Sequence, residues 1–114
     1  MQAVVPIPFT ETLMDSIKIS LEQFRNLMLS AGYDHVTERS WAPNTKIEER
    51  IHPFDANAIV IQGEMTLGIK GSEPRKLTTG DTFNILANTP HSEEYGKEGT
   101  TYWVARKGSI SVVN

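Results

Sequence analysis

Apolar residues at helical spacing predict one α-helix near the start of the chain. Four of them recur every three or four positions and share one face: Leu21, Phe24, Leu27 and Met28. Ser20 is placed to cap the first turn, with Gln23 as its capping-box partner, and Gly32 follows the last turn as the C′ residue. We expect the apolar face to pack against the rest of the domain.

From Tyr33 onward the pattern changes to short apolar runs separated by turn residues about every 8–12 positions, which is typical of a β-sandwich or barrel. About nine strands are predicted, over residues 35–41, 46–52, 56–62, 65–70, 75–77, 82–86, 91–95, 102–107 and 110–113. Gly63-Glu64 and residues 96–99 are predicted turns, with Gly63, Gly80 and Gly96 expected at positive φ. Because the helix is separate from the strands, parallel βαβ folds are excluded and the fold class is all-β.

The chain is predicted to form a single domain in two parts, an arm and helix over residues 1–34 and a β-barrel over residues 35–114. Residues 4–9 are apolar but include Pro6 and Pro8, which suit an extended edge segment rather than a central strand. Such an arm would be poorly buried alone. We therefore expect it to pack on a second copy of the chain in a homodimer.

Composition narrows the classes of function. The 114 residues include 11 basic and 14 acidic side chains, a net charge of −3, so nucleic-acid binding is not expected. The longest aliphatic run, residues 58–61, is far too short to cross a membrane, and no secretory signal is recognisable, so a cytoplasmic protein is expected. Without cysteine there is no thiolate nucleophile or ligand, and a histidine metal site must draw on His35, His52 and His91.

Two segments resemble the sequence motifs of the cupin superfamily. Residues 50–64 read RIHPFDANAIVIQGE, similar to the first cupin motif, G-x5-H-x-H-x3,4-E-x6-G. Residues 80–93 read GDTFNILANTPHSE, similar to the second, G-x5-P-x-G-x2-H-x3-N. The resemblance extends over residues 36–107 and is to small single-domain cupins. It implies a double-stranded β-helix (jelly-roll) barrel, often homodimeric, and in many members a divalent metal ion held inside by three His and one Glu.

The departures from these motifs fall on the metal ligands. Aligned on Gly63, the first His position is Arg50, the second is His52 and the Glu position is Ala56, while the His of the second motif is His91. A guanidinium has no lone pair to give to a metal, and Ala56 has no donor atom. Two histidines alone are fewer ligands than the three that a catalytic metal site usually has.

Nearby carboxylates offer one way to rebuild a metal site. By strand alternation or by sequence proximity, three of them are candidates: Glu48, Asp55 and Glu93. One of these with His52 and His91 would make a two-His-one-carboxylate site for Fe, Mn, Ni or Zn. That site would suit a metal-dependent enzyme of the dioxygenase or isomerase type, although the charge of Arg50 opposes a dication.

Arg50 also favours a different site, one without a resident metal. Its planar guanidinium offers two donors to a carboxylate. The predicted pocket for a small polar or anionic molecule is lined by Arg50, His52, Phe83, Ile85, His91, Tyr95 and Trp103. In a third interpretation Arg50 only pairs with Glu48, Asp55 or Glu93 inside a closed barrel. We prefer a small-molecule-binding cupin without a standard metal cofactor and with no catalytic residue assigned, and keep the metal-dependent enzyme as the alternative.

Overall fold

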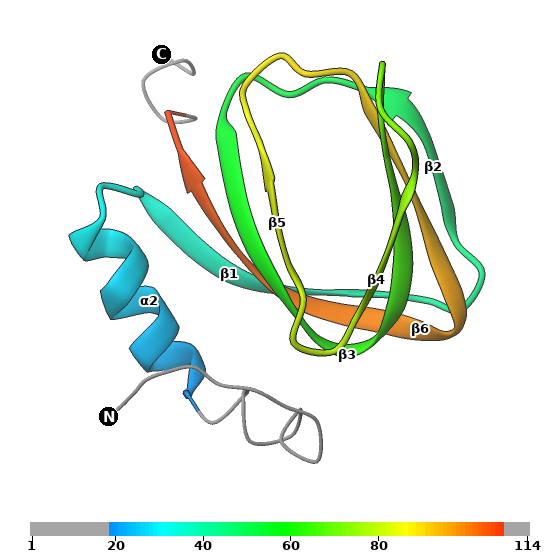
Figure 1. Cartoon of the computed structure of the whole chain (residues 1–114). Helices are drawn as coiled ribbons and strands as arrows, with labels where there is room; N and C mark the ends of the chain where they lie inside the picture. The colour runs from blue at the N-terminus through cyan, green and yellow to red at the C-terminus, as the bar shows by residue number, and fades with distance from the viewer. Residues whose placement is uncertain (1–18, 109–114) are drawn as a thin grey trace.

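The computed structural model describes residues 19–108, which form an antiparallel β-barrel with one helix on its outside (Figure 1). The helix is α2 (Leu21–Ser30). The strands are β1 (His35–Trp41), β2 (Lys46–Arg50), β3 (Asp55–Ile69), β4 (Arg75–Thr78), β5 (Thr82–Ile85) and β6 (His91–Lys107). The all-β class is confirmed, whereas the predicted arm at residues 4–9 and strand at residues 110–113 lie outside the described range.

The two longest strands, β3 and β6, hold the barrel together. They pair with each other from Asp55 opposite Lys107 to Ile69 opposite His91. Strands β5 and β1 flank the half of this pair that contains Asp55, whereas β4 and β2 flank the half that contains Ile69. Each long strand therefore contributes to both halves of one six-stranded sheet and passes from one half to the other at a bend.

These bends lie where the sequence predicts turns, and the prediction of turns is wrong. Both strands continue through residues 63–64 and 96–99, with register shifts between Val60 and Met65. Gly63 has a φ of +83°, and a Cβ there would come within 2.1 Å of the Gly99 carbonyl oxygen. Glycine is thus required for a close crossing of two strands rather than for a hairpin, while Gly96 is not at positive φ. Two predicted pairs of strands are consequently single bent strands.

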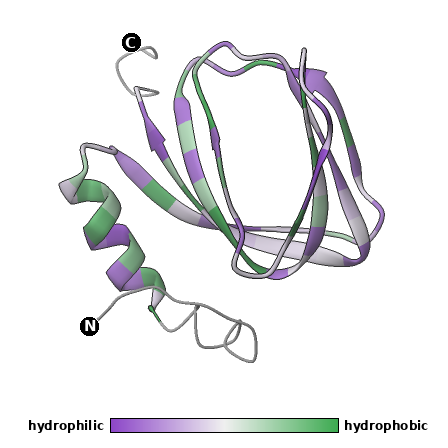
Figure 2. Ribbon diagram, viewed as in Figure 1, coloured by the Kyte–Doolittle hydropathy of each residue, from purple (hydrophilic) through white to green (hydrophobic). Residues whose placement is uncertain are grey.

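The register shifts change the side of the strand that faces the interior. On β3 the buried interior residues are even-numbered before the bend and odd-numbered after it: Ala56, Ala58, Val60, Met65 and Leu67. Hydrophobic segments alternate with polar ones along the barrel strands (Figure 2). We call the end of the barrel at Asp55 and Ile69, where β3 begins and finishes, the open end. The end at the Gly63 bend is the closed end.

Helix α2 packs on the outside of the barrel. The predicted capping box is confirmed, because Ser20 and Gln23 each accept a hydrogen bond from the other's backbone N–H. Phe24 contacts Trp103, with ring centroids 5.8 Å apart. Leu27 is 59% exposed, so the prediction that it belongs to the buried stripe is wrong. Among the residues described, no helix has the length and apolar character needed to span a membrane.

Candidate functional site

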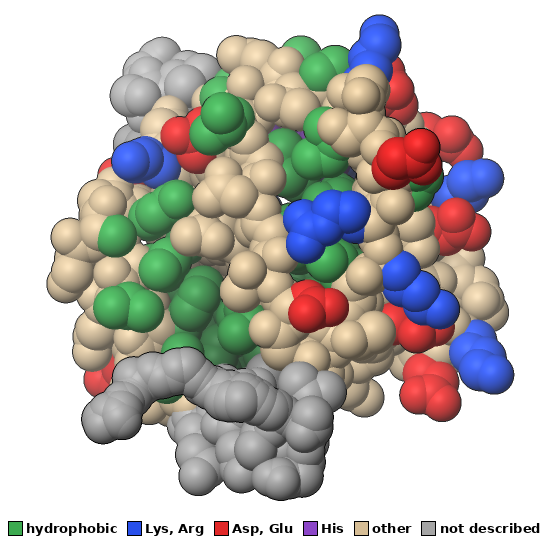
Figure 3. All heavy atoms as spheres, viewed as in Figure 1, with side chains coloured by type: hydrophobic (Ala, Val, Ile, Leu, Met, Phe, Trp, Pro, Cys, Tyr) green, Lys and Arg blue, Asp and Glu red, His purple; other side chains and the backbone are tan. Residues whose placement is uncertain are grey.

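The open end of the barrel contains a cavity of about 230 Å³. Side chains from five strands and from the loop after β2 line it: Arg39, Arg50, His52, Phe54, Ala56, Phe83, Ile85, Glu93, Tyr102, Val104 and Arg106. The lining therefore combines basic side chains with apolar ones. Figure 3 shows one face of the molecule, with Lys or Arg atoms in front of hydrophobic atoms near its centre.

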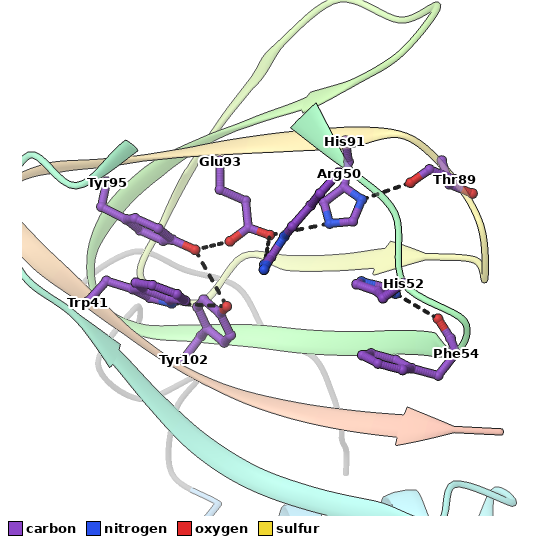
Figure 4. A network of polar contacts seen from close by, with 9 residues as sticks. All are labelled: Trp41, Arg50, His52, Phe54, Thr89, His91, Glu93, Tyr95 and Tyr102. Carbon is purple, nitrogen blue, oxygen red and sulfur yellow. Dashed lines mark hydrogen bonds and ion pairs between the residues drawn. The ribbon is translucent and has the colours of Figure 1, made fainter. Parts of the chain in front are cut away.

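Two histidines at this end are oriented by backbone carbonyls (Figure 4). The Nδ1 atom of His52 lies 3.0 Å from the Phe54 oxygen, and that of His91 lies 2.8 Å from the Thr89 oxygen. Because a carbonyl only accepts, each ring carries a proton on Nδ1, which in the neutral ring leaves the Nε2 lone pair free. The rings meet edge to face at 4.8 Å. The Nε2 atom of His91 is buried and makes no hydrogen bond, although it lies 3.5 Å from a Glu93 carboxylate oxygen.

Glu93 is a buried carboxylate, 4% exposed, with partners on both oxygens. Its Oε2 atom lies 3.4 Å from an Arg50 nitrogen, and its Oε1 atom accepts a hydrogen bond from the Tyr95 hydroxyl. The Tyr102 hydroxyl lies 3.5 Å from that of Tyr95 and accepts a hydrogen bond from Trp41 Nε1 at 3.1 Å. Burial raises the pKa of both tyrosines, and the charge of Glu93 adds to the effect. Both hydroxyls therefore stay protonated at neutral pH.

Three guanidinium groups reach the cavity, from Arg39, Arg50 and Arg106. Aromatic faces orient two of them: Arg106 lies 4.8 Å from the Phe54 ring centroid and Arg39 lies 4.9 Å from that of Trp41. The Nε atom of Arg106 is buried and has no hydrogen-bond partner. Burial first, and then the charge of Arg39, lower the pKa of Arg106. The arginines therefore repel one another across a partly desolvated space.

The lining of the cavity has a surplus of positive charge. Burial, followed by the neighbouring His91, lowers the pKa of His52, so this imidazole is neutral at neutral pH. Three arginines against the single carboxylate of Glu93 leave two positive charges, in a chain whose net charge is −3. The cavity is therefore positively charged although the whole chain is negatively charged.

Solved structures share this architecture, whereas no family model and no curated protein matches the sequence. A structure of the DMSP lyases RdDddP and RnDddQII is 22% identical over 65% of this chain and 38% of that chain, with a TM-score of 0.60. Oxalate oxidase in complex with the substrate analogue glycolate is 25% identical over 65% of this chain and 41% of its own, with a TM-score of 0.58. KdgF from Halomonas sp. is 18% identical over 67% of this chain and 71% of its own, with a TM-score of 0.56. These neighbours have cupin jelly-roll barrels.

The described barrel is a cupin fold. The jelly-roll architecture implied by the sequence motifs is thus confirmed. The chain spans only 38% of the length of the lyase structure and 41% of that of the oxidase, so the likeness concerns the barrel itself.

The cupin barrel brings some predicted site residues together and separates others. Arg50, His52, Phe83 and Ile85 line the cavity. His91 contacts His52, and Tyr95 lies behind Glu93. The prediction that Trp103 lines the pocket is wrong, because its ring packs under α2 and its Nε1 atom donates to Glu38 at 3.1 Å. The bend in β6 is the reason: Tyr102 and Val104 face the interior after it, so Trp103 faces outward.

The side chains at the cupin metal positions do not fit a metal ion. Of the candidate carboxylates, Glu48 is exposed on β2, and Asp55 accepts a hydrogen bond at 2.8 Å from the Ala87 N–H. Glu93 does lie beside His91, but the guanidinium of Arg50 holds it. Within residues 19–108, no group of three or more His, Cys, Asp or Glu side chains is placed to hold a metal ion. The site therefore has cationic hydrogen-bond donors at positions where the cupin motifs have metal ligands.

Sequence reasoning missed two cavity arginines and Tyr102. Arg106 lies opposite Ala56, the vacant Glu position, and Arg39 lies opposite Tyr102. Both arginines lie in segments that the sequence predicts to be extended. The inward direction of Arg106 depends on the parity change at the β6 bend, which the predicted turn at residues 96–99 concealed, and that of Arg39 depends on its pairing with Tyr102. These residues could have been found only with the knowledge that β6 pairs continuously with β3.

Proposed function

We propose that this cavity binds a small organic anion and does so without a resident metal ion. One observation carries the proposal: Arg39 and Arg106 face the cavity, and within the described part of the chain neither has a carboxylate at ion-pair distance. A partly buried charge without a partner is unfavourable. A bound carboxylate would supply the missing charge and accept the unused hydrogen bond of the Arg106 Nε–H.

The size of the cavity limits the ligand to a small molecule. A volume of about 230 Å³ corresponds to roughly eight water molecules at their share of liquid volume. The lining also includes the apolar side chains of Phe83, Ile85 and Val104, which suit a short carbon skeleton. A similar structure, oxalate oxidase, was solved with glycolate, itself a small carboxylate, which supports this size and class of ligand.

His52 gives this site a second kind of polar contact. Its Nδ1–H is held by the Phe54 carbonyl and its ring is stacked on Phe54, with centroids 4.1 Å apart. The lowered pKa keeps the ring neutral, so Nε2 presents a lone pair. In the proposed complex this nitrogen accepts a hydrogen bond from a ligand hydroxyl or water, while the arginines hold the anionic group.

The second candidate function is a metal-dependent enzyme centred on His52 and His91. It is favoured by one feature, the donation of both Nδ1–H groups to backbone carbonyls, since metal-ligating histidines are commonly fixed in this way. A metal would additionally require Glu93 to leave Arg50. Elemental analysis of protein purified without an affinity tag distinguishes the two functions. Stoichiometric metal that is lost in both His52→Ala and His91→Ala would support the enzyme.

Calorimetric titration of EDTA-treated protein with glycolate and succinate tests the proposed function. We expect saturable binding of at least one of them, weakened at least about tenfold by Arg106→Gln. Arg75→Gln is the matched control, because Arg75 is an exposed arginine on β4 outside the cavity; it should bind as the parent chain does. Absence of binding by either anion at millimolar concentration, or equal loss in both variants, would contradict the proposal.

A further inference from the structure

The charges in the cavity also bear on how many negative charges the ligand has. Glu93 already has partners on both oxygens, Arg50 on one and Tyr95 on the other. The Arg50 charge is therefore compensated within the protein. Arg39 and Arg106 remain, and each is fixed by an aromatic ring rather than by a carboxylate. One bound monoanion would neutralise only one of these two guanidinium groups.

The two uncompensated arginines approach the cavity from different places. Arg39 is on β1, opposite Tyr102, whereas Arg106 is four positions further along β6. At the usual rise of about 3.4 Å per residue, their backbone positions differ by roughly 14 Å along the strand direction. Arg106 packs on Phe54 and Arg39 on Trp41, so the two side chains of these neighbouring strands are held against different rings. Two separated cations are matched better by two anionic groups joined by a short chain than by one compact anion.

We infer that the ligand of this cavity is a short dicarboxylate, with one carboxylate on Arg106 and the other on Arg39. This inference rests on the proposed function and makes it more specific. The apolar side chains of Ala56 and Val104 line the same cavity and would contact the carbon chain of the ligand. Inorganic phosphate has comparable charge but is compact and has no carbon chain, so it is expected to bind more weakly.

Succinate and monomethyl succinate form a matched pair of probes, since they share a carbon skeleton and differ by one charge. We expect the EDTA-treated chain to bind succinate at least about tenfold more tightly than the monoester at low salt, in calorimetric titrations. Arg39→Gln should reduce this ratio to about one, because the second carboxylate then has no partner. Arg75→Gln should keep the ratio of the parent chain.

The outcomes separate this inference from the function on which it rests. Equal or tighter binding of the monoester would overturn the dicarboxylate and leave an anion-binding site in place. Tighter binding of phosphate than of succinate, lost in Arg106→Gln, would assign the site to a compact anion instead. Failure of all three probes would remove the proposed function as well. The comparison of succinate with its monoester uses the unmodified chain, so a variant that fails to fold does not decide the result.

Discussion

The closed and open ends of this barrel are built from the same two strands but have opposite character. At the closed end Val60, Met65 and Leu77 are at most 1% exposed and fill the interior with apolar atoms. At the open end Ala56 leaves room for a cavity, and arginine occupies the opposite position on β6. The strands thus stabilise the barrel through one end and leave the other available for a ligand. Substitutions at the two ends should affect stability and binding differently.

The largest loss of stability is expected at the closed end. Met65→Ala removes a side chain that is 1% exposed and leaves a cavity among packed neighbours. We expect the free energy of unfolding to fall by about 2–5 kcal/mol. Leu86→Ala is the control, because Leu86 is 63% exposed and its truncation should change stability by less than about 0.5 kcal/mol. Equal effects in chemical denaturation would contradict the packed closed end.

Glu93 contacts both Arg50 and Tyr95, and its substitution should have the next largest effect on stability. Glu93→Gln removes the charge that accepts from Tyr95 and attracts Arg50. A loss of about 1–3 kcal/mol of unfolding free energy is expected, as for a hydrogen bond to a charged group. Glu64→Gln is the matched control, since the Glu64 carboxylate lies on the surface and pairs with an exposed Lys76 at 3.6 Å. An unchanged free energy of unfolding in Glu93→Gln would contradict a stabilising role for these two contacts.

Arg50→His should make the open end better suited to bind a metal ion. The new imidazole would join His52 and His91 and release Glu93 from its guanidinium partner. We expect affinity for zinc or nickel to rise about tenfold, or about 1.4 kcal/mol, in titrations of tag-free protein. Arg75→His controls for a histidine added elsewhere. No gain would show that the vacant position at Ala56 or the shape of the cavity is what prevents metal binding.

Arg106→Met should stabilise the unliganded barrel while it abolishes anion binding. The substitution removes a partly buried charge that Arg39 repels and keeps an apolar contact with Phe54. The expected gain is small, about 1 kcal/mol or less, because replacing unfavourable buried charge by apolar volume is neutral to stabilising. Thermal unfolding without ligand measures it. A marked loss of stability would indicate that Arg106 is a structural residue rather than a binding residue.

The smallest effect should be a dependence of stability on alkaline pH. The pKa of Tyr95 and that of Tyr102 are raised in the folded state, mainly by burial. Their contribution is complete below the unfolded pKa of about 10 and is lost as pH rises above it, because the unfolded chain then releases protons more readily. Tyr95→Phe should flatten the fall in unfolding free energy above pH 10. Tyr33→Phe, outside this network, should retain the slope of the parent chain.

The sequence predicted the helix and the all-β class from local periodicity and turn residues, whereas the cupin barrel was implied by the resemblance to the two cupin motifs. It also placed Arg50 and His52 at the cavity through their alignment with the first cupin motif, although β2 shifts register before Arg50 and ends there. It did not predict the bends at residues 63–64 and 96–99, because a glycine at a strand crossing has the same local signature as a glycine in a turn. For the same reason Trp103 was wrongly assigned to the pocket and Arg106 was missed, because the directions of both side chains follow from pairing between distant segments.

We propose above that Arg39 and Arg106 bind an anion without a metal. The most direct measurement is a proton–nitrogen correlation spectrum of the arginine Nε–H groups in EDTA-treated protein, titrated with succinate and assigned with Arg39→Gln and Arg106→Gln. We expect the Arg106 and Arg39 signals to move together and saturate, while the Arg75 signal stays fixed. Signals that do not move, or that move only after zinc is added, would contradict it.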